Sequence, residues 1–203
     1  MTPDGADQLT DYDSLGRTVA WRSFLDEARQ RLEAAGFASA DIEARRIVEE
    51  ASGYEGAGFH SGLNELATQR GVVAFDAMLG RRLGGEPLQY VLGRWGFRTL
   101  DLLVDRRALI PRPETEVVAG VALDELSRLA TPGRRLTALD LGTGTGAIGL
   151  SLAAERPDTE VILTDVSTEA LKVARANLAG LGRAGTRVSI AQGSWFVALP
   201  DRL

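Results

Sequence analysis

Residues 138–149 read ALDLGTGTGAIG, so an apolar run meets three closely spaced glycines and then a helix-forming stretch. Glycine permits positive φ angles and lets another molecule approach the backbone more closely than a Cβ atom would allow. A turn of this kind between a strand and a helix also presents the free N–H groups of the helix start. The segment therefore predicts a buried strand, a tight turn that binds a small molecule, and a helix.

Strands and helices alternate around this turn. The apolar patterns predict a helix over Glu114–Leu129, then a strand over Leu136–Leu141, a helix over Ala147–Glu155, a strand over Glu160–Thr164, a helix over Thr168–Leu181 and a strand over Arg187–Ala191. This alternation is typical of an α/β fold with a parallel, Rossmann-like sheet. The first strand of such a sheet lies in its middle, so three strands alone would leave residues 136–141 at an edge.

The chain before this sheet has a different pattern. From about Leu15 to Leu83 apolar residues recur at helical spacing, with Ser39 placed to cap one helix, and the pattern stops at a pair of glycines. Between Pro87 and Ile110 the pattern changes to period two, which predicts a β-hairpin. We expect a helical domain over residues 1–85, a hairpin linker over 86–110 and an α/β domain over 111–203.

The composition excludes several kinds of site. Cysteine is absent and His60 is the only histidine, which excludes disulfides, thiolate nucleophiles and Cys/His zinc sites, and we assign no metal ligand. The only lysine, Lys172, does not follow a GxxxxG stretch, which excludes a P-loop. The net charge is −5 and the arginine pairs are scattered among acids, which argues against direct nucleic-acid binding.

The first fourteen residues carry four acids and no base, the reverse of a signal peptide. The longest run without a charge, Leu141–Ala154, has 14 residues, fewer than the roughly 20 that a membrane-spanning helix needs. We therefore expect a cytoplasmic protein that does not bind a membrane, and the sequence predicts no oligomeric state.

Two acids bear on the ligand of the glycine turn. Asp140 precedes the first glycine, where a carboxylate suits the cationic amino group of S-adenosyl-L-methionine better than a pyrophosphate. Asp165 follows the second strand, where a carboxylate accepts hydrogen bonds from ribose hydroxyls, although it could instead cap the next helix. The glycines at 144, 146 and 149 also fit GxGxxG, so the glycines alone do not exclude a dinucleotide.

Four motifs together resemble a known family. They are GEPLQYVLGRWGF (85–97), LIPRPETE (109–116), LDLGTGTGAIGLSLA (139–153) and SWF (194–196). Their order and spacing are similar to those of the HemK-type peptide chain release factor N5-glutamine methyltransferases, over residues 15–203. Ribosomal-protein glutamine methyltransferases look similar and remain the nearest alternative.

The resemblance implies that the helical domain contacts a release factor and that the α/β domain methylates the glutamine amide in the factor's GGQ loop. It implies S-adenosylmethionine as cofactor, held by Gly142, Thr143, Gly144, Thr145 and Gly146, with Asp165 on the ribose and Trp195 beside the adenine. Trp195 could also be a core residue. Ser194 replaces an acid that relatives often carry, so the affinity for the cofactor is expected to be lower.

No catalytic residue is assigned. In the family an NPPY motif holds the acceptor amide, and these 203 residues contain none. We therefore expect the chain to be catalytically incomplete, either as a truncated or frame-shifted piece or as a standalone product. The loop residues Arg112, Glu114 and Glu116 resemble a loop that closes over the site, but the two glutamates also suit the first turn of a helix. A non-catalytic binding protein and a nucleic-acid amino-group methyltransferase are the other functions considered.

Overall fold

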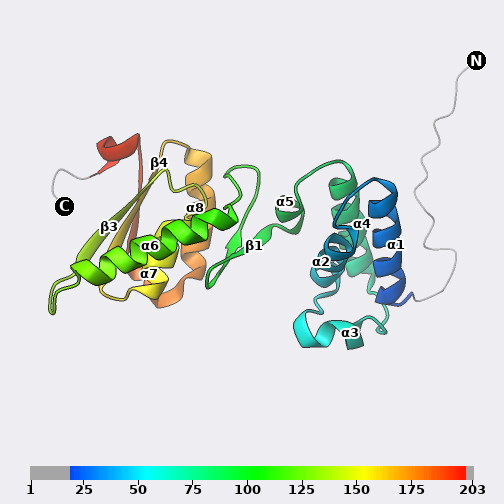
Figure 1. Cartoon of the computed structure of the whole chain (residues 1–203). Coiled ribbons are helices and arrows are strands. Elements are labelled where there is room, and N and C mark those ends of the chain that lie inside the picture. Colours follow the sequence, from blue (N-terminus) through cyan, green and yellow to red (C-terminus); the bar gives the residue numbers. More distant parts are fainter. Residues whose placement is uncertain (1–18, 200–203) are drawn as a thin grey trace, which may run out of the picture. The chain divides into compact units, whose positions relative to one another are not determined.

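The structure, a computed structural model, describes residues 19–199 and is drawn in Figure 1. It comprises two compact units, of which the first ends at Gly85 and the second begins at Glu86. Residues 15–18, where the predicted helical region begins, and residues 200–203 lie outside the described part. Each unit buries its own set of apolar side chains.

The first unit is helical. Its helices are α1 (Trp21–Ala34), α2 (Ala40–Ser52), η2 (Gly56–Gly58), α3 (Phe59–Gly62) and α4 (Gln69–Leu83). Helix α1 buries Phe24, Ala28 and Leu32, at helical spacing, and the Phe24 ring meets that of Phe75 in α4 with centroids 5.1 Å apart. Within residues 19–85 the only β pairing is an isolated bridge, so the predicted helical character is correct.

The starts of two helices differ in their capping. The Thr68 side chain accepts a hydrogen bond from the Gly71 N–H at 3.1 Å, which satisfies a free donor in the first turn of α4. Ser39 occupies the N-cap position of α2 as predicted, but its side chain accepts no capping bond. Its ψ of 34° departs from the extended conformation that directs a capping hydroxyl toward the helix, so the predicted bond is wrong.

The second unit contains a parallel sheet. Its elements are α6 (Pro113–Leu129), β3 (Leu136–Leu141), α7 (Ala147–Glu155), β4 (Thr159–Asp165), α8 (Thr168–Gly180), η3 (Gly182–Arg187), β5 (Val188–Gln192) and η4 (Trp195–Ala198). The three strands lie in the order β3-β4-β5, with Leu141 beside Thr164 and Thr164 beside Ala191. The predicted α/β class is confirmed, and β3 lies at an edge as expected.

Helices α7 and α8 connect successive strands that lie side by side. Helix α7 packs on β3 and β4, and α8 packs on β4 and β5 (Figure 1). Because both crossovers step in the same direction and such crossovers are right-handed, the two helices cover the same face of the sheet. This face holds the core around Leu150, Val161 and Leu163, all at most 1% exposed.

A short helix and a β-hairpin precede the sheet. Helix α5 (Leu88–Leu92) begins after Pro87 and ends at Gly93, whose φ is 75°, so the first residues of the predicted hairpin segment are helical. The hairpin itself pairs β1 (Arg94–Phe97) with β2 (Leu100–Leu103) in antiparallel fashion. The predicted hairpin is therefore correct over residues 94–103, whereas residues 104–110 of the predicted segment form no strand.

The closed end of the hairpin is attached to two helices of its own unit. Arg98, whose φ is 52°, donates from Nε and Nη2 to the two carboxylate oxygens of Glu155 in α7, each at 2.7 Å. The Arg98 N–H also donates to Glu116 of α6 at 3.2 Å. Phe97 and Leu102 are buried in the core that α7 and β4 share. The hairpin is thus packed as part of the α/β unit.

None of the described helices is both long and apolar enough to cross a bilayer.

Candidate cofactor-binding site

The glycine turn follows the carboxyl end of β3. Gly142, Gly144 and Gly146 have φ angles of 80°, 56° and 87°, a region that side chains rarely adopt. The Thr164 carbonyl accepts from the N–H groups of Gly142 and Thr143 at 2.8 and 2.9 Å, which fixes the turn to the end of β4. A Cβ atom added to Gly142 or Gly144 would meet nothing within 4 Å, so the space beside these two backbones is open to a ligand.

Asp140 stabilises the glycine turn through its carboxylate. Its Oδ2 accepts from the Thr143 hydroxyl at 2.6 Å and from the Gly149 N–H at 2.9 Å. Burial raises the pKa of this carboxyl, and the two hydrogen bonds oppose that rise. The sequence interpretation had Asp140 facing a ligand's amino group, whereas the structure commits Oδ2 to the turn itself.

Asp165 lies at the end of β4, beside the turn. Its Oδ2 accepts from the Gly144 N–H at 3.0 Å, and its Oδ1 accepts from the Ser167 N–H at 2.9 Å. The N-cap of α8 is Ser167, whose hydroxyl accepts from Ala170, so the alternative role of Asp165 as that cap is wrong. The structure brings Asp165 together with the glycine turn although 21 residues separate it from Gly144.

Trp195 begins η4, just past the end of β5. Its side chain is 69% exposed and its φ is 47°, so it is not a core tryptophan. The Gly193 N–H donates to the Asp165 carbonyl at 3.0 Å and thereby joins the segment before Trp195 to the end of β4. Trp195 therefore shares the carboxyl edge of the sheet with the turn, one strand beyond Asp165. Ser194 is the N-cap of η4 and makes no side-chain cap bond.

The two threonines of the turn have different roles. Thr143 and Thr145 are 7% and 2% exposed, so both side chains are buried beneath the turn. Thr143 uses its hydroxyl to bind Asp140, while the Thr145 carbonyl accepts a hydrogen bond from Asn177 at 2.9 Å. Neither threonine side chain is therefore placed to meet a ligand.

The residues that resemble a closing loop lie at the start of α6. Arg112 is exposed at the N-cap of α6, and Glu114 is exposed in its first turn. Glu116 accepts from the Arg98 N–H and so stabilises the hairpin end. The structure therefore supports the role of the two glutamates as acids in the first turn of α6.

Sequence reasoning missed Asn177. It lies on α8 with the buried residues Ala170, Val173 and Ala174, and it is 9% exposed. An amide on the apolar side of a helix must find hydrogen-bond partners, because burying an unpaired polar group is costly. Its position at helical spacing from three small apolar residues is the signal that would have shown it to be buried.

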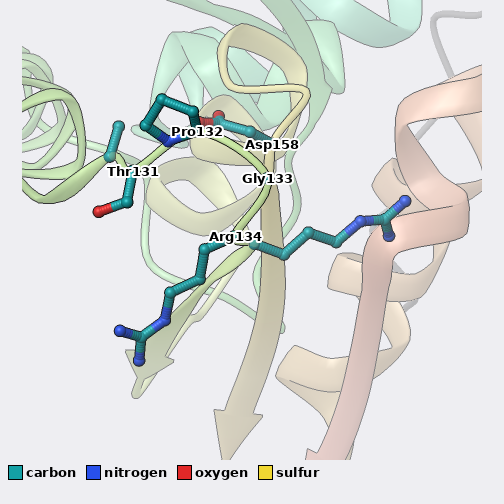
Figure 2. Close-up of a pocket in the computed structure, with 7 residues that line it drawn as sticks. Thr131, Pro132, Gly133, Arg134 and Asp158 are labelled. Carbon is teal, nitrogen blue, oxygen red and sulfur yellow. The ribbon is translucent and has the colours of Figure 1, made fainter.

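A hollow of about 570 Å³ lies elsewhere on the second unit, lined by residues 130–135 and Asp158 (Figure 2). These residues precede β3 and β4, so the hollow lies at the amino ends of strands whose carboxyl ends carry the glycine turn. Two of its charged residues are already paired, Arg135 with Glu160 and Asp158 with Arg156. It is therefore separate from the candidate site.

Two protein families match the chain. The PrmC N-terminal domain matches residues 23–93, and the methyltransferase small domain matches residues 122–199. The second match contains the whole glycine turn, Asp165 and Trp195.

Three curated relatives are each named release factor glutamine methyltransferase. The protein of Deinococcus radiodurans is 38% identical over 179 residues, which are 88% of this chain and 62% of the relative. That of Agrobacterium fabrum is 36% identical over 178 residues, 88% of this chain and 61% of the relative. That of Neisseria gonorrhoeae is 46% identical over 121 residues, 60% of this chain and 41% of the relative. The chain thus spans about three fifths of the length of the first two.

Proposed function

This chain belongs to the family of release factor glutamine methyltransferases, and on that premise we propose that it binds S-adenosylmethionine for methylation of a release factor glutamine. The acceptor is the side-chain amide of the glutamine in the factor's GGQ loop. Because a release factor acts in translation, the protein would act in the cytoplasm. The observation that carries the proposal is the hydrogen bond from the Gly144 N–H to Asp165, which places a carboxylate that can accept from ribose hydroxyls beside the open backbone of Gly142 and Gly144.

Each part of the cofactor has a group of suitable chemistry at the site. Within the turn of residues 142–146, the backbone of Gly142 and Gly144 is open to the methionine part, since a Cβ there would occupy free space. Asp165 retains unused acceptor positions on both carboxylate oxygens, and a charged acceptor binds hydroxyl donors strongly. The exposed indole of Trp195 offers a flat face for the adenine. When bound, the cofactor supplies a sulfonium methyl group as the electrophile.

The charges at the turn favour this cofactor over a dinucleotide. Asp140 accepts from the Gly149 N–H, one of the first donors of α7, so this donor is not available to a pyrophosphate. The carboxyl group of Asp165 lies beside the same turn. Acids around the turn repel a pyrophosphate and attract the sulfonium and ammonium groups of S-adenosylmethionine.

The acceptor amide needs precise placement. Its nitrogen is a poor nucleophile because the lone pair is delocalised into the carbonyl, so most of the catalysis comes from positioning it in line with the methyl group. The NPPY sequence that the family resemblance assigns to this task does not occur in these 203 residues. Methyl transfer is therefore best tested in a protein that supplies it.

The test joins this chain to the C-terminal part of the Deinococcus radiodurans relative that lies beyond the matched region. The fusion is incubated with labelled S-adenosylmethionine and a bacterial release factor, beside the 203-residue chain alone. We expect the fusion to methylate the GGQ glutamine, and Asp165→Ala in the fusion to lower the rate at limiting cofactor by about ten- to a hundredfold. Binding of the cofactor with methylation of ribosomal protein or nucleic acid instead would contradict the proposed substrate.

A further inference from the structure

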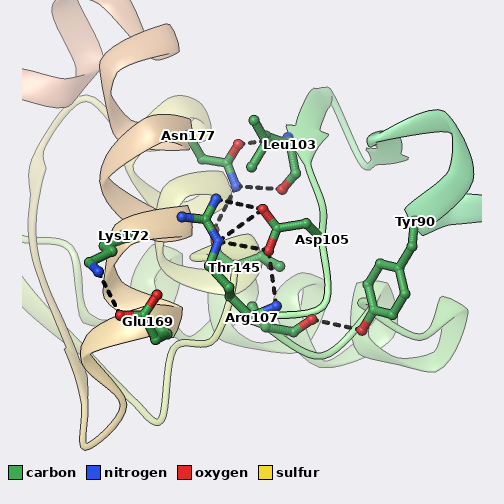
Figure 3. A network of polar contacts seen from close by, with 9 residues as sticks. Tyr90, Leu103, Asp105, Arg107, Thr145, Glu169, Lys172 and Asn177 are labelled. Atoms are coloured by element: carbon green, nitrogen blue, oxygen red, sulfur yellow. Dashed lines mark hydrogen bonds and ion pairs between the residues drawn. The ribbon is translucent and has the colours of Figure 1, made fainter. Parts of the chain in front are cut away.

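Asn177 joins two segments that lie far apart in the sequence (Figure 3). From α8 it reaches Leu103, at the end of the hairpin strand β2, and Thr145, in the middle of the glycine turn. Leu103 is 74 residues away from Asn177, and Thr145 is 32 residues away. All three residues belong to the second unit.

The hydrogen bonds use every group of the amide. Oδ1 accepts from the Leu103 N–H at 2.7 Å, and Nδ2 donates to the Leu103 carbonyl at 3.1 Å. The second Nδ2 hydrogen goes to the Thr145 carbonyl at 2.9 Å. The side chain thus pairs with Leu103 as a neighbouring strand would, and it binds the turn at the same time. Aspartate would lose both donors, and leucine would lose all three bonds.

Three side chains form hydrogen bonds with the glycine turn. Asp140 fixes Thr143, Asp165 fixes Gly144, and Asn177 fixes the carbonyl of Thr145. The first two are acids at strand β3 and strand β4, whereas Asn177 is the member of the set that also contacts the hairpin. Asn177 is therefore a buried side chain that contacts both the turn and β2.

We propose that Asn177 is a positioning residue that couples the glycine turn to the hairpin, so that an occupied cofactor site makes strand β2 more ordered. The inference rests on the proposed function, since it takes S-adenosylmethionine as the ligand of the turn. The coupling is reciprocal: a hairpin held in place by Asn177 strengthens cofactor binding by the same factor. The pair of Arg98 with Glu155 also holds the hairpin, at its closed end, on α7.

The experiment titrates the isotope-labelled 203-residue chain with S-adenosylhomocysteine, and it measures affinity by calorimetry and hydrogen exchange of the Leu103 N–H by NMR. In the wild type we expect saturation to slow exchange of this N–H by about tenfold, within the usual range of coupling between sites. In Asn177→Leu we expect about tenfold weaker binding and no change in exchange at Leu103 on saturation. Ala176→Gly is the matched control, because it weakens the exposed side of α8 without removing these bonds.

The outcomes separate the inference from the proposed function. Unchanged affinity in Asn177→Leu, with exchange at Leu103 still responding to the ligand, would overturn the coupling and leave the function standing. Equal losses in Ala176→Gly would overturn it too, because they would reveal a general effect of helix stability. Absence of binding in the wild type would contradict the function itself. If Asn177→Leu does not fold, the wild type alone tests the coupling. Unchanged hydrogen exchange of the Leu103 N–H and of the Asn177 side-chain NH₂ on ligand saturation would refute it.

Discussion

The Gly149 N–H donates to the Asp140 carboxylate at 2.9 Å. At this point α7 lies so close to the sheet that only glycine fits. A Cβ atom on Gly149 would lie 2.1 Å from Leu163 Cδ2 and 3.0 Å from Asp140 Oδ2. The same short approach packs α7 on β4 and lets a buried acid hold the glycine turn. A single residue without a side chain therefore serves both the core and the site.

We expect Gly149→Ala to destabilise the second unit by about 1–3 kcal/mol, because the new methyl group overpacks a closed contact with Leu163. The free energy of unfolding in urea measures this loss. Gly180→Ala is the matched control, since Gly180 is exposed on α8 and a Cβ there meets nothing within 4 Å. The control should keep or slightly raise the stability. Equal stabilities of the two variants would show that the close approach at Gly149 does not exist.

Asp140 should make stability depend on pH. Burial raises its pKa above the ordinary 3.8, so the folded chain holds this proton more tightly than the unfolded chain. Its contribution to the free energy of unfolding is therefore fully present below pH 3.8 and is lost as the pH rises through the folded pKa.

The comparison of Asp140→Asn with the wild type isolates this contribution. An amide oxygen in place of Oδ2 can still accept from Thr143 and Gly149, and it has no proton to lose. The free energy of unfolding of the variant, minus that of the wild type, should therefore rise with pH above 3.8. Asp140→Ala leaves both donors unpaired and should be less stable than Asp140→Asn by about 1–3 kcal/mol at all pH values. A difference between Asn and wild type that falls with pH would contradict the raised pKa.

Trp195 should report the cofactor by fluorescence. The chain has three tryptophans. Trp21 is only 2% exposed in the first unit, Trp95 is half-buried in β1, and Trp195 is 69% exposed at the proposed adenine position. Saturation with S-adenosylmethionine should change the emission of the wild type and leave that of Trp195→Phe nearly constant. Trp195→Ala should weaken binding by about 1–3 kcal/mol through lost stacking, and Trp195→Phe by less. An unaltered fluorescence response in Trp195→Phe would place the adenine elsewhere.

The sequence predicted the parts whose patterns are local. Strand β3 and helix α7 have the predicted bounds, because a buried strand, a glycine turn and a helix each have a distinctive local composition. The contact between Asp165 and the turn was also predictable, since the carboxyl ends of parallel strands lie at the same edge of a sheet.

The remaining features depend on contacts between distant segments. Asn177 gains its role from Leu103 and Thr145, and no local pattern reveals such partners. The carboxylate of Asp140 turns to Gly149 because the sheet and α7 approach closely, which only the packing decides. Helix α5 was missed because its five residues are too few for a helical pattern to be distinguished from a strand pattern.

Calorimetric titration of the 203-residue chain with S-adenosylmethionine, for the wild type and for Asp165→Ala, tests the proposed cofactor site most directly. Asp124→Ala, which removes an exposed acid from α6, is the control. A charge-assisted hydrogen bond is worth roughly 1.5–3 kcal/mol, so we expect Asp165→Ala to bind about ten- to a hundredfold more weakly and the control to match the wild type. Equal affinity of Asp165→Ala and the wild type, or binding of NAD in preference to S-adenosylmethionine, would contradict a cofactor site at the glycine turn.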